Sequence, residues 1–197
     1  MVQALAGSQS AFEQIVARYQ RPVIGLIARI TGDRDHAEDL AQDTFVKAFR
    51  NLAAFDTTRR LSSWLFRIAH NTAIDAMRRS HLRSHGIAAS YGGRANPRAE
   101  SIDADLETAA GRAHEPAAPP APDPVERQEL GRALELALAG LRPDQRAAIV
   151  LRYEHGLSFG DIGTVLGVPE ATARSHVHRA RKELAQRLST SGWSPRR

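Results

Sequence analysis

The chain has 197 residues, with 27 Lys and Arg against 22 Asp and Glu, a formal net charge of +5, and no cysteine. Its length suits one domain or two small ones, and its 42% hydrophobic content excludes a wholly disordered chain. The lack of cysteine excludes disulfides, thiolate zinc sites and cysteine nucleophiles. The excess of basic side chains favours an anionic partner.

The first residues, "MVQALAGSQSAF", include no basic segment and no long apolar run. No apolar stretch anywhere approaches the ~18 residues that a membrane-spanning helix needs. We therefore expect a cytoplasmic protein that does not insert into a membrane.

Apolar side chains recur at three- and four-residue steps over 12–30 and 40–52, which predicts two amphipathic helices. Pro22 is expected to restart or kink the first of them. A third helix is predicted over 61–79, with Ser62 or Ser63 as its N-cap. No comparable strand pattern occurs, so we predict an all-α fold.

The second predicted helix begins in a run of acidic residues, "GDRDHAEDLAQDTFVKAF". Acidic side chains in a first turn stabilise the helix dipole, which is one explanation of the run. Asp39, Gln42, Asp43 and Lys47 also form a polar strip that could dock a basic helix of a partner. Spacing alone does not separate the two explanations.

The third predicted helix carries Arg67, Asn71, Asp75 and Arg78 on one side, next to Trp64. The polar segment "FDTTRRL" precedes it. Arginines beside an aromatic ring can hold unstacked bases of a single strand. The alternative is that Trp64 packs in the core, as a lone tryptophan in an apolar seam usually does.

Six of the ten prolines fall between residues 97 and 124, where no helical or strand period can form. We predict a helical domain over 1–80, a flexible Pro/Ala-rich linker over 81–124, a second helical domain over 125–190 and a disordered tail over 191–197. The alternative is a long surface loop within a single domain, which is uncommon in compact folds.

The second domain is predicted to contain a helix over 125–141 and another that starts near Pro143 and stops at Gly156. Ser158 and Asp161 match a capping box that opens a short helix, and "LGVP" ends it before a longer helix begins at about Pro169 or Glu170. A short helix, a tight turn and a basic helix predict a helix-turn-helix.

At 100° per residue, the last helix divides into an apolar stripe and a basic face. The basic face could lie in a DNA major groove, where arginine bonds guanine edges or phosphates; the alternative is an ordinary solvated surface. His176 and His178 point to different sides, and His81 and His85 have no nearby carboxylate, so we expect polar surface histidines and no metal site. The basic face comprises Arg174, Ser175, His178, Arg179, Arg181 and Lys182.

Two segments in the right order resemble the extracytoplasmic-function (ECF) sigma factors, which are specificity subunits of bacterial RNA polymerase. "DHAEDLAQDTFVKAFRNLAAFD" with "SSWLFRIAHNTAIDAMRR" is similar to sigma region 2, and "LRPDQRAAIVLRYEHGLSFGDIGTVLGVPEATARSHVHRARKEL" is similar to sigma region 4. Relatives often have a β-branched residue at the position of Ala173 and a basic one at that of His176, and a shorter linker.

The resemblance implies a non-enzymatic initiation factor that binds core RNA polymerase and promoter DNA and needs no cofactor or small-molecule substrate. It also implies that an anti-sigma factor controls this protein and could hold it near the membrane. It implies recognition of a melted −10 element by region 2 and of a duplex −35 element by region 4. The implied residues are Asp39, Gln42, Asp43, Phe45 and Lys47 for polymerase; Asp56, Thr57, Thr58, Arg59, Arg60, Trp64, Arg67, Asn71 and Arg78 for the −10 element; and Thr172, Arg174, Ser175, His178, Arg179, Arg181 and Lys182 for the −35 element.

Two rival functions remain. A helix-turn-helix regulator that binds duplex DNA without polymerase would explain 158–188 but leave the acidic strip and the 61–79 helix without a role. A nucleic-acid enzyme such as a recombinase would need clustered carboxylates for metal ions or an activated nucleophile, and the acidic residues here are dispersed or lie at helix starts.

Overall fold

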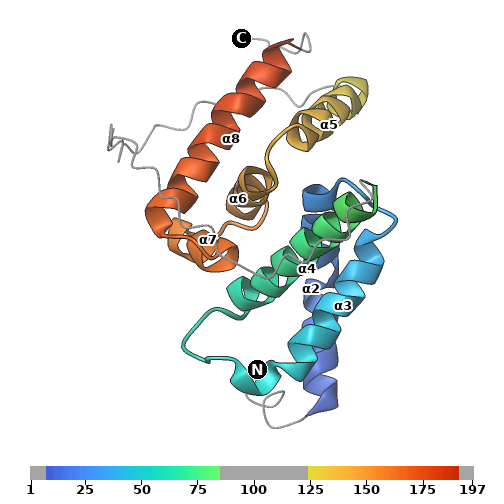
Figure 1. Ribbon diagram of the computed structural model, residues 1–197, viewed down its shortest axis with the longest axis vertical. Helices are drawn as coiled ribbons and strands as arrows, with labels where there is room; N and C mark the ends of the chain where they lie inside the picture. Colours follow the sequence, from blue (N-terminus) through green and yellow to red (C-terminus); the bar gives the residue numbers. More distant parts are fainter. Residues whose placement is uncertain (1–7, 85–123, 191–197) are drawn as a thin grey trace.

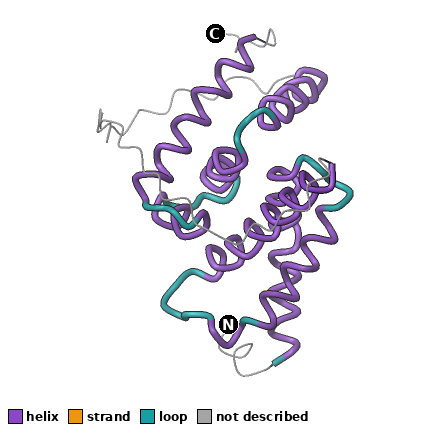
Figure 2. Tube along the Cα trace, viewed as in Figure 1, coloured by secondary structure: helices purple, strands orange, loops and turns teal. Residues whose placement is uncertain are grey.

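The computed structural model describes residues 8–84 and 124–190, and every regular element in these two ranges is a helix (Figure 2). The predicted all-α fold is confirmed. The predicted linker, except for its two ends, and the predicted tail lie outside the described residues. The elements are α2 (Gln9–Thr31), α3 (Ala37–Arg50), the 3-10 turn η1 (Leu52–Ala54), α4 (Leu61–Ser84), α5 (Pro124–Ala139), α6 (Pro143–Tyr153), α7 (Phe159–Leu166) and α8 (Glu170–Thr190).

Helix α2 starts at the cap residue Ser8, whose hydroxyl accepts a hydrogen bond from the Ala11 amide, and ends at Gly32 in the left-handed conformation (φ 74°). Pro22 lies inside this single helix, so the predicted restart did not occur. The missing Pro22 amide leaves the carbonyl of Arg18 without its helical partner, but Arg18 is exposed and water can bond that carbonyl. Burial of the apolar stripe beyond Pro22 keeps the helix continuous.

Helix α4 begins at the predicted residue but differs from its prediction in its N-cap and in its C-terminal end. It starts at Leu61, so Ser62 and Ser63 lie in its first turn and neither is the N-cap. It also continues to Ser84, past the predicted end at 79, because residues 80–84 contain no glycine or proline that would stop a helix. Helices α2, α3 and α4 pack against one another through the apolar stripes that the sequence predicted.

The C-terminal half follows its predicted sequence of starts and stops. Pro143 opens α6, and Gly156 follows it with φ 64°. Ser158 caps α7, Gly167 ends it at φ 69°, and α8 starts at Glu170. Helices α6 and α7 both lie against α8, which forms one edge of this half (Figure 1).

The two halves are not held apart, because one continuous core runs from α2 and α4 into α6, α7 and α8. Helix α4 packs on α7 and α2 packs on α6, and Figure 1 shows the N-terminal helices on one side of this contact and α6, α7 and α8 on the other. The sequence predicted two domains on a tether and gave no sign of this contact. Apolar residues far apart in sequence form it, and helical periodicity says which face of a helix is buried but not which helix covers it.

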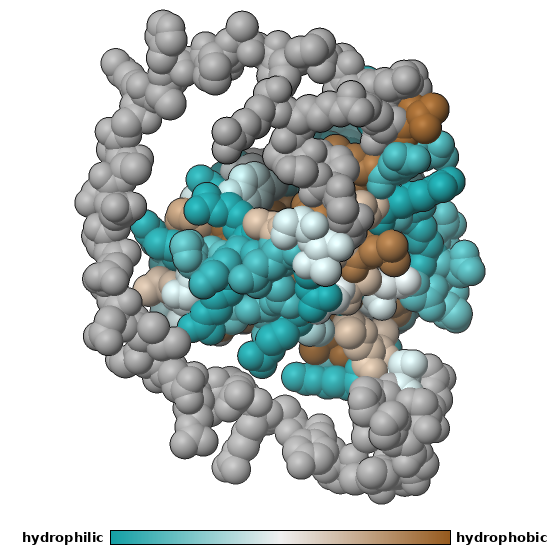
Figure 3. Space-filling model, turned by 90° about the horizontal axis from the view of Figure 1, so that it is seen from above, coloured by the Kyte–Doolittle hydropathy of each residue, from teal (hydrophilic) through white to brown (hydrophobic). Residues whose placement is uncertain are grey.

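Hydrophilic side chains cover much of the described surface in the view of Figure 3. Among the described residues, no helix is long and apolar enough to cross a membrane. No group of three or more metal-ligating side chains occurs in the same ranges. His176 differs from its prediction as a surface residue, because it is half-buried and its Nδ1 is a buried atom without a hydrogen-bond partner. The side chains of His81 and His85 lie outside the described residues.

Candidate nucleic-acid and partner interfaces

The turn between α7 and α8 depends on two local features. The Ser158 hydroxyl accepts from the Asp161 amide (3.1 Å) and donates to the Asp161 carboxylate (2.7 Å), which caps α7. At Gly163, an added Cβ would lie 2.7 Å from the carbonyl oxygen of Val168, so only glycine allows the chain to pass this closely. The capping box and the glycine together fix the angle at which α8 leaves α7.

Helix α8 has the two faces that its sequence predicted. Ala173, Val177, Ala180 and Leu184 are buried against the other helices of this half, while Thr172 is half-buried. The opposite face is open to solvent and carries a net positive charge. Its exposed residues are Arg174, Ser175, His178, Arg179, Arg181 and Lys182.

Arg174 is held by neighbours that the sequence did not single out. Its guanidinium carbon lies 4.8 Å from the ring centre of Phe159, and its Nη2 donates to Glu170 (3.2 Å). The guanidinium of Arg152 lies 4.7 Å from the same ring, so Phe159 contacts two cations. Arg152 itself is fixed by a bond to the carbonyl of Leu157 (2.8 Å). The aromatic ring therefore restricts the position of Arg174.

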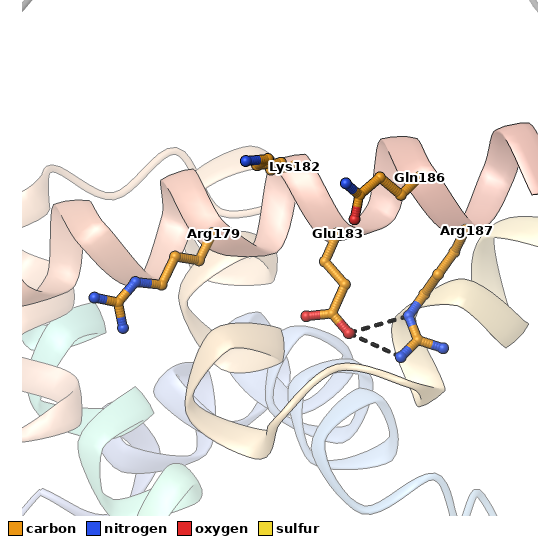
Figure 4. Close-up of a pocket in the computed structure, with 5 residues that line it drawn as sticks. All are labelled: Arg179, Lys182, Glu183, Gln186 and Arg187. Atoms are coloured by element: carbon orange, nitrogen blue, oxygen red, sulfur yellow. Dashed lines mark hydrogen bonds and ion pairs between the residues drawn. The ribbon is translucent and has the colours of Figure 1, made fainter.

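Farther along α8, residues from successive turns of the helix line a hollow (Figure 4). These residues are Arg179, Lys182, Glu183, Gln186 and Arg187. Glu183 accepts two hydrogen bonds from Arg187, at 3.1 and 2.8 Å, and Arg187 also donates to the carbonyl of Gly140 (3.0 Å). Arg179 and Lys182 form no ion pair with any described residue. This end of α8 thus presents two cations that are free to bind phosphates.

The acidic strip is exposed on α3. The helix begins beside Asp33, whose carboxylate accepts from the His36 amide (3.1 Å), and this hydrogen bond lowers the pKa of Asp33. Asp39, Gln42 and Asp43 are exposed along the following turns. Their side chains share one face of α3, as the spacing predicted.

Two other residues predicted to bind polymerase make contacts within the protein. Phe45 is only 8% exposed and packs in the core, so its ring does not take part in the α3 surface. Lys47 donates from Nζ to the hydroxyl of Thr72 on α4 (3.0 Å). The sequence missed Val46 and Phe49, which are exposed beside the strip, with Phe49 edge-to-face on Phe12 at 5.1 Å. The only signal for these two residues in the sequence was the recurrence of apolar side chains at helical spacing along this segment.

The segment 56–60 is an exposed loop shaped by one aspartate. The Asp56 carboxylate accepts from the amide (3.0 Å) and hydroxyl (2.7 Å) of Thr58, and these bonds lower the pKa of Asp56. Arg59 lies 3.4 Å from the same carboxylate. At the end of the loop, Trp64 is half-buried and packs edge-to-face on Phe55 at 5.1 Å. Both interpretations of Trp64 fit this position, because part of the ring packs and part is accessible.

The remaining predicted residues of α4 form an exposed line. Arg67, Asn71 and Arg78 recur on one face, and Arg78 lies 3.8 Å from Asp75 on the same face. The loop 56–60 directly precedes α4, so the loop, the accessible part of Trp64 and this exposed line follow one another in the N-terminal half. The basic face of α8 belongs to the other half, so two separate polar surfaces exist.

Comparisons with known proteins match both halves. The family described as Sigma-70 region 2 matches residues 15–83, and Sigma-70, region 4 matches residues 131–184. The chain is 33% identical to the ECF RNA polymerase sigma factor SigW of Bacillus subtilis (strain 168), over 94% of this chain and 93% of that protein.

Two solved structures share the fold across nearly the whole chain. One is CnrH in complex with the cytosolic domain of CnrY (26% identity, TM-score 0.64, covering 96% of this chain and 94% of that one). The other is the sigma factor RpoE in complex with the anti-sigma factor NepR from Bartonella quintana (27% identity, TM-score 0.63, covering 91% and 97%). With both regions matched in order and a relative aligned over almost its full length, the chain belongs to the ECF sigma factors of RNA polymerase.

Proposed function

We propose that this ECF sigma factor directs core RNA polymerase to promoters through three surfaces: the α3 strip, the loop 56–60 with α4, and the basic face of α8. The observation that carries the proposal is the division of α8. A capped helix-turn-helix buries one side of α8 and leaves the other basic and accessible. In helix-turn-helix proteins this second helix lies in the major groove.

The basic face of α8 is proposed to bind the duplex −35 element. Arg174, fixed by Phe159, is placed to bond a base edge, because a restricted guanidinium loses less entropy on binding. Arg179 and Lys182 lack ion pairs within the described residues and are better suited to phosphates. Thr172, Ser175, His178 and Arg181 complete this surface.

The loop 56–60 and α4 are proposed to bind the −10 element as a single strand. Unstacked bases can rest on the accessible part of Trp64 and bond Asn71, while Arg67 and Arg78 contact the backbone. The loop contributes Asp56, Thr57, Thr58, Arg59 and Arg60. This side of α4 is polar and exposed along several turns, as a strand-binding surface requires.

The α3 strip of Asp39, Gln42 and Asp43, with Lys47 at its end, is proposed to dock core polymerase. Phe45 is left out of this surface because it is buried. Exposed Val46 and Phe49 beside the strip supply apolar area, which a stable protein interface needs at its centre. The expected partner surface is therefore basic with an apolar patch.

Such a factor acts by binding, so the proposal includes no catalytic residue, no cofactor and no small-molecule substrate. We also propose a cytoplasmic location and an anti-sigma factor as the control partner. Support for that partner comes from RpoE of Bartonella quintana, which is solved in complex with the anti-sigma factor NepR and shares the fold.

The test is run-off transcription from bacterial genomic DNA with core polymerase and this protein, mapping RNA 5′ ends against a reaction with core polymerase alone. We expect new starts that share a two-part upstream motif. An absence of new starts, in a protein that still binds duplex DNA, would support the plain helix-turn-helix regulator instead.

Matched variants assign the surfaces. Asp43→Arg should weaken core polymerase binding, while Asp35→Arg, the same change on an exposed residue outside the strip, should not. Arg174→Ala should cost about 1–3 kcal/mol at particular −35 bases if its contact is bidentate. Arg132→Ala, at an exposed position of α5, is its control. Equal polymerase affinity for both aspartate variants would remove the strip from the interface.

A further inference from the structure

The carboxylate of Glu170 lies beside the arginine that is proposed to bond a −35 base. Its Oε1 accepts a hydrogen bond from Nη2 of Arg174 (3.2 Å), which lies one turn farther along α8. Residues four apart share one side of a helix, so the two side chains meet without distorting α8. The sequence marked Glu170 only as a start of the last helix, where an acidic residue already stabilises the helix dipole.

Glu170 is also attracted from the side of α7. Its second carboxylate oxygen, Oε2, lies 3.5 Å from the position that a Cβ would take at Gly160. Gly160 belongs to the first turn of α7, so the carboxylate lies near the amino ends of both helices of the helix-turn-helix. Amino ends of helices carry partial positive charge. This attraction holds the carboxylate at the turn whether or not Arg174 bonds it.

Glu170 neutralises part of a cluster of positive charge. The guanidinium groups of Arg152 and Arg174 lie over the same ring, at 4.7 and 4.8 Å from the centre of Phe159. Among the described residues, Glu170 is the only carboxylate that pairs with either arginine. Arg152 donates to the carbonyl of Leu157 instead. Without the carboxylate, the cluster would hold two uncompensated positive charges and attract any phosphate near it.

The pair leaves most of the Arg174 fork available. A guanidinium has five N–H donors in one plane, and the hydrogen bond to Glu170 uses Nη2. The donors on Nη1 and Nε of Arg174 form no hydrogen bond within the described residues. Arginine bonds a guanine through two donors, to O6 and N7. Arg174 can therefore bond a guanine edge while it keeps its bond to Glu170.

The charge of the DNA acceptor decides which contact Glu170 permits. The first turn of a recognition helix contacts base edges in helix-turn-helix docking, so Glu170 lies at the end of α8 that meets DNA. A guanine edge is neutral, and a carboxylate beside it costs little. A phosphate bound at Arg174 is an anion beside that carboxylate, and the two repel. Glu170 thus penalises the contact that carries no sequence information.

We propose that Glu170 is a positioning residue of the −35 surface, which keeps Arg174 on guanine edges and off phosphates. It thereby raises sequence discrimination and lowers affinity for non-specific DNA. This role rests on the proposed function and adds a residue that determines its specificity. A purely structural role predicts the opposite sign, because loss of a helix-stabilising carboxylate would weaken binding to every duplex.

Three variants isolate the charge of Glu170. Glu170→Gln keeps the shape of the side chain and an oxygen acceptor for Arg174, and removes only the negative charge. Its matched control is Glu183→Gln, the same change on the same helix at another carboxylate that pairs with an arginine four residues on. In that control, Arg187 stays bonded to the carbonyl of Gly140. The double variant Glu170→Gln with Arg174→Ala shows whether the carboxylate acts through Arg174.

Two DNA probes separate discrimination from non-specific binding. The first is an alternating A·T duplex, which offers Arg174 phosphates but no guanine. The second is a pool of short duplexes with a randomised centre, whose bound fraction is sequenced. Both are titrated with the full chain, and the pool is also bound by its complex with core polymerase. The base pair whose preference disappears in Arg174→Ala is the one that Arg174 reads.

Glu170→Gln should bind the A·T duplex roughly two- to five-fold more tightly, the range for one exposed ion pair, because both side chains are 56% exposed. The slope of log affinity against log salt should become steeper by about 0.9, which corresponds to one more phosphate contact. Preference for guanine at the base pair that Arg174 reads should fall by at least the same factor as the A·T affinity rises. Glu183→Gln should change neither the slope nor the guanine preference.

Equal slopes and equal guanine preferences in the parent and Glu170→Gln would overturn the role of Glu170 alone, since the parent would still read its −35 element. The same rise in slope between Arg174→Ala and the double variant would also overturn it, because the carboxylate would then repel DNA without acting through Arg174. A parent that prefers no sequence in either form would refute the −35 surface of the proposed function, and this role with it. Circular dichroism of each variant checks that its helices are intact.

Discussion

Arg146→Met is expected to destabilise the folded protein and to uncouple its two halves. The substitution keeps a long apolar stem in α6 and removes the guanidinium that bonds four carbonyls. Methionine keeps an unbranched apolar stem of similar length, so the cost comes chiefly from lost polar contacts rather than from a cavity.

The magnitude follows from the burial of the acceptors. The bonds to Ile30 and Leu141 are buried, so their carbonyls lose partners that water cannot easily replace, at about 1–3 kcal/mol each. The carbonyls of Arg29 and Ala139 are partly accessible and lose less. Burial lowers the pKa of Arg146, which marks a desolvation cost that the variant no longer carries. We expect a net loss of about 3 kcal/mol.

Urea unfolding followed by circular dichroism measures this loss. The control is Arg132→Met at an exposed position of α5, whose stability we expect within about 0.5 kcal/mol of the parent. If Arg146 couples the halves, the variant should also unfold in two steps where the parent unfolds in one. A loss below about 1 kcal/mol with a single transition would show that the four hydrogen bonds contribute little and that apolar packing alone joins the halves.

Three further results are expected. Phe159→Leu should lower −35 duplex affinity several-fold by releasing Arg174, while Phe159→Tyr should retain it; equal affinities in a binding titration would exclude a positioning role for the ring. Burial lowers the pKa of both His155 and His176 from 6.5, so the folded form favours their neutral state. Their contribution to the free energy of unfolding is fully present above pH 6.5 and is lost as the pH falls through the lowered pKa values. Urea unfolding at pH 7.5 and 5.5 should therefore show lower stability at pH 5.5. Ser158→Ala should cost about 1 kcal/mol in thermal unfolding, and Ser158→Thr much less, because the hydroxyl caps α7.

The helix-turn-helix could be predicted almost completely from local sequence. The capping box at Ser158, the glycine that ends α7 and the apolar period of α8 each act within a few residues. Such signals depend on backbone geometry that the chain carries with it. The division of α8 into a buried and a basic face was correct for the same reason.

Errors arose where burial depends on a distant element. Phe45 belongs to a polymerase-binding helix by resemblance, yet it is buried, because α3 turns that side toward the core. His176 was predicted on the surface and is half-buried. The N-cap of α4 was placed at Ser62 or Ser63 because serine favours caps, but both lie in its first turn, and Ser63 bonds Asp161 in the other half.

The sequence by itself determined the helices, their caps, the helix-turn-helix and the family, because these depend on contacts within a turn or two and on motifs in order. Only the tertiary structure determined that α4 packs on α7 and α2 on α6, that Arg146 bonds the end of α2, and that Arg60 is paired with Asp161. These contacts join residues about 100 or more positions apart, and periodicity along a chain contains no information on which buried faces meet.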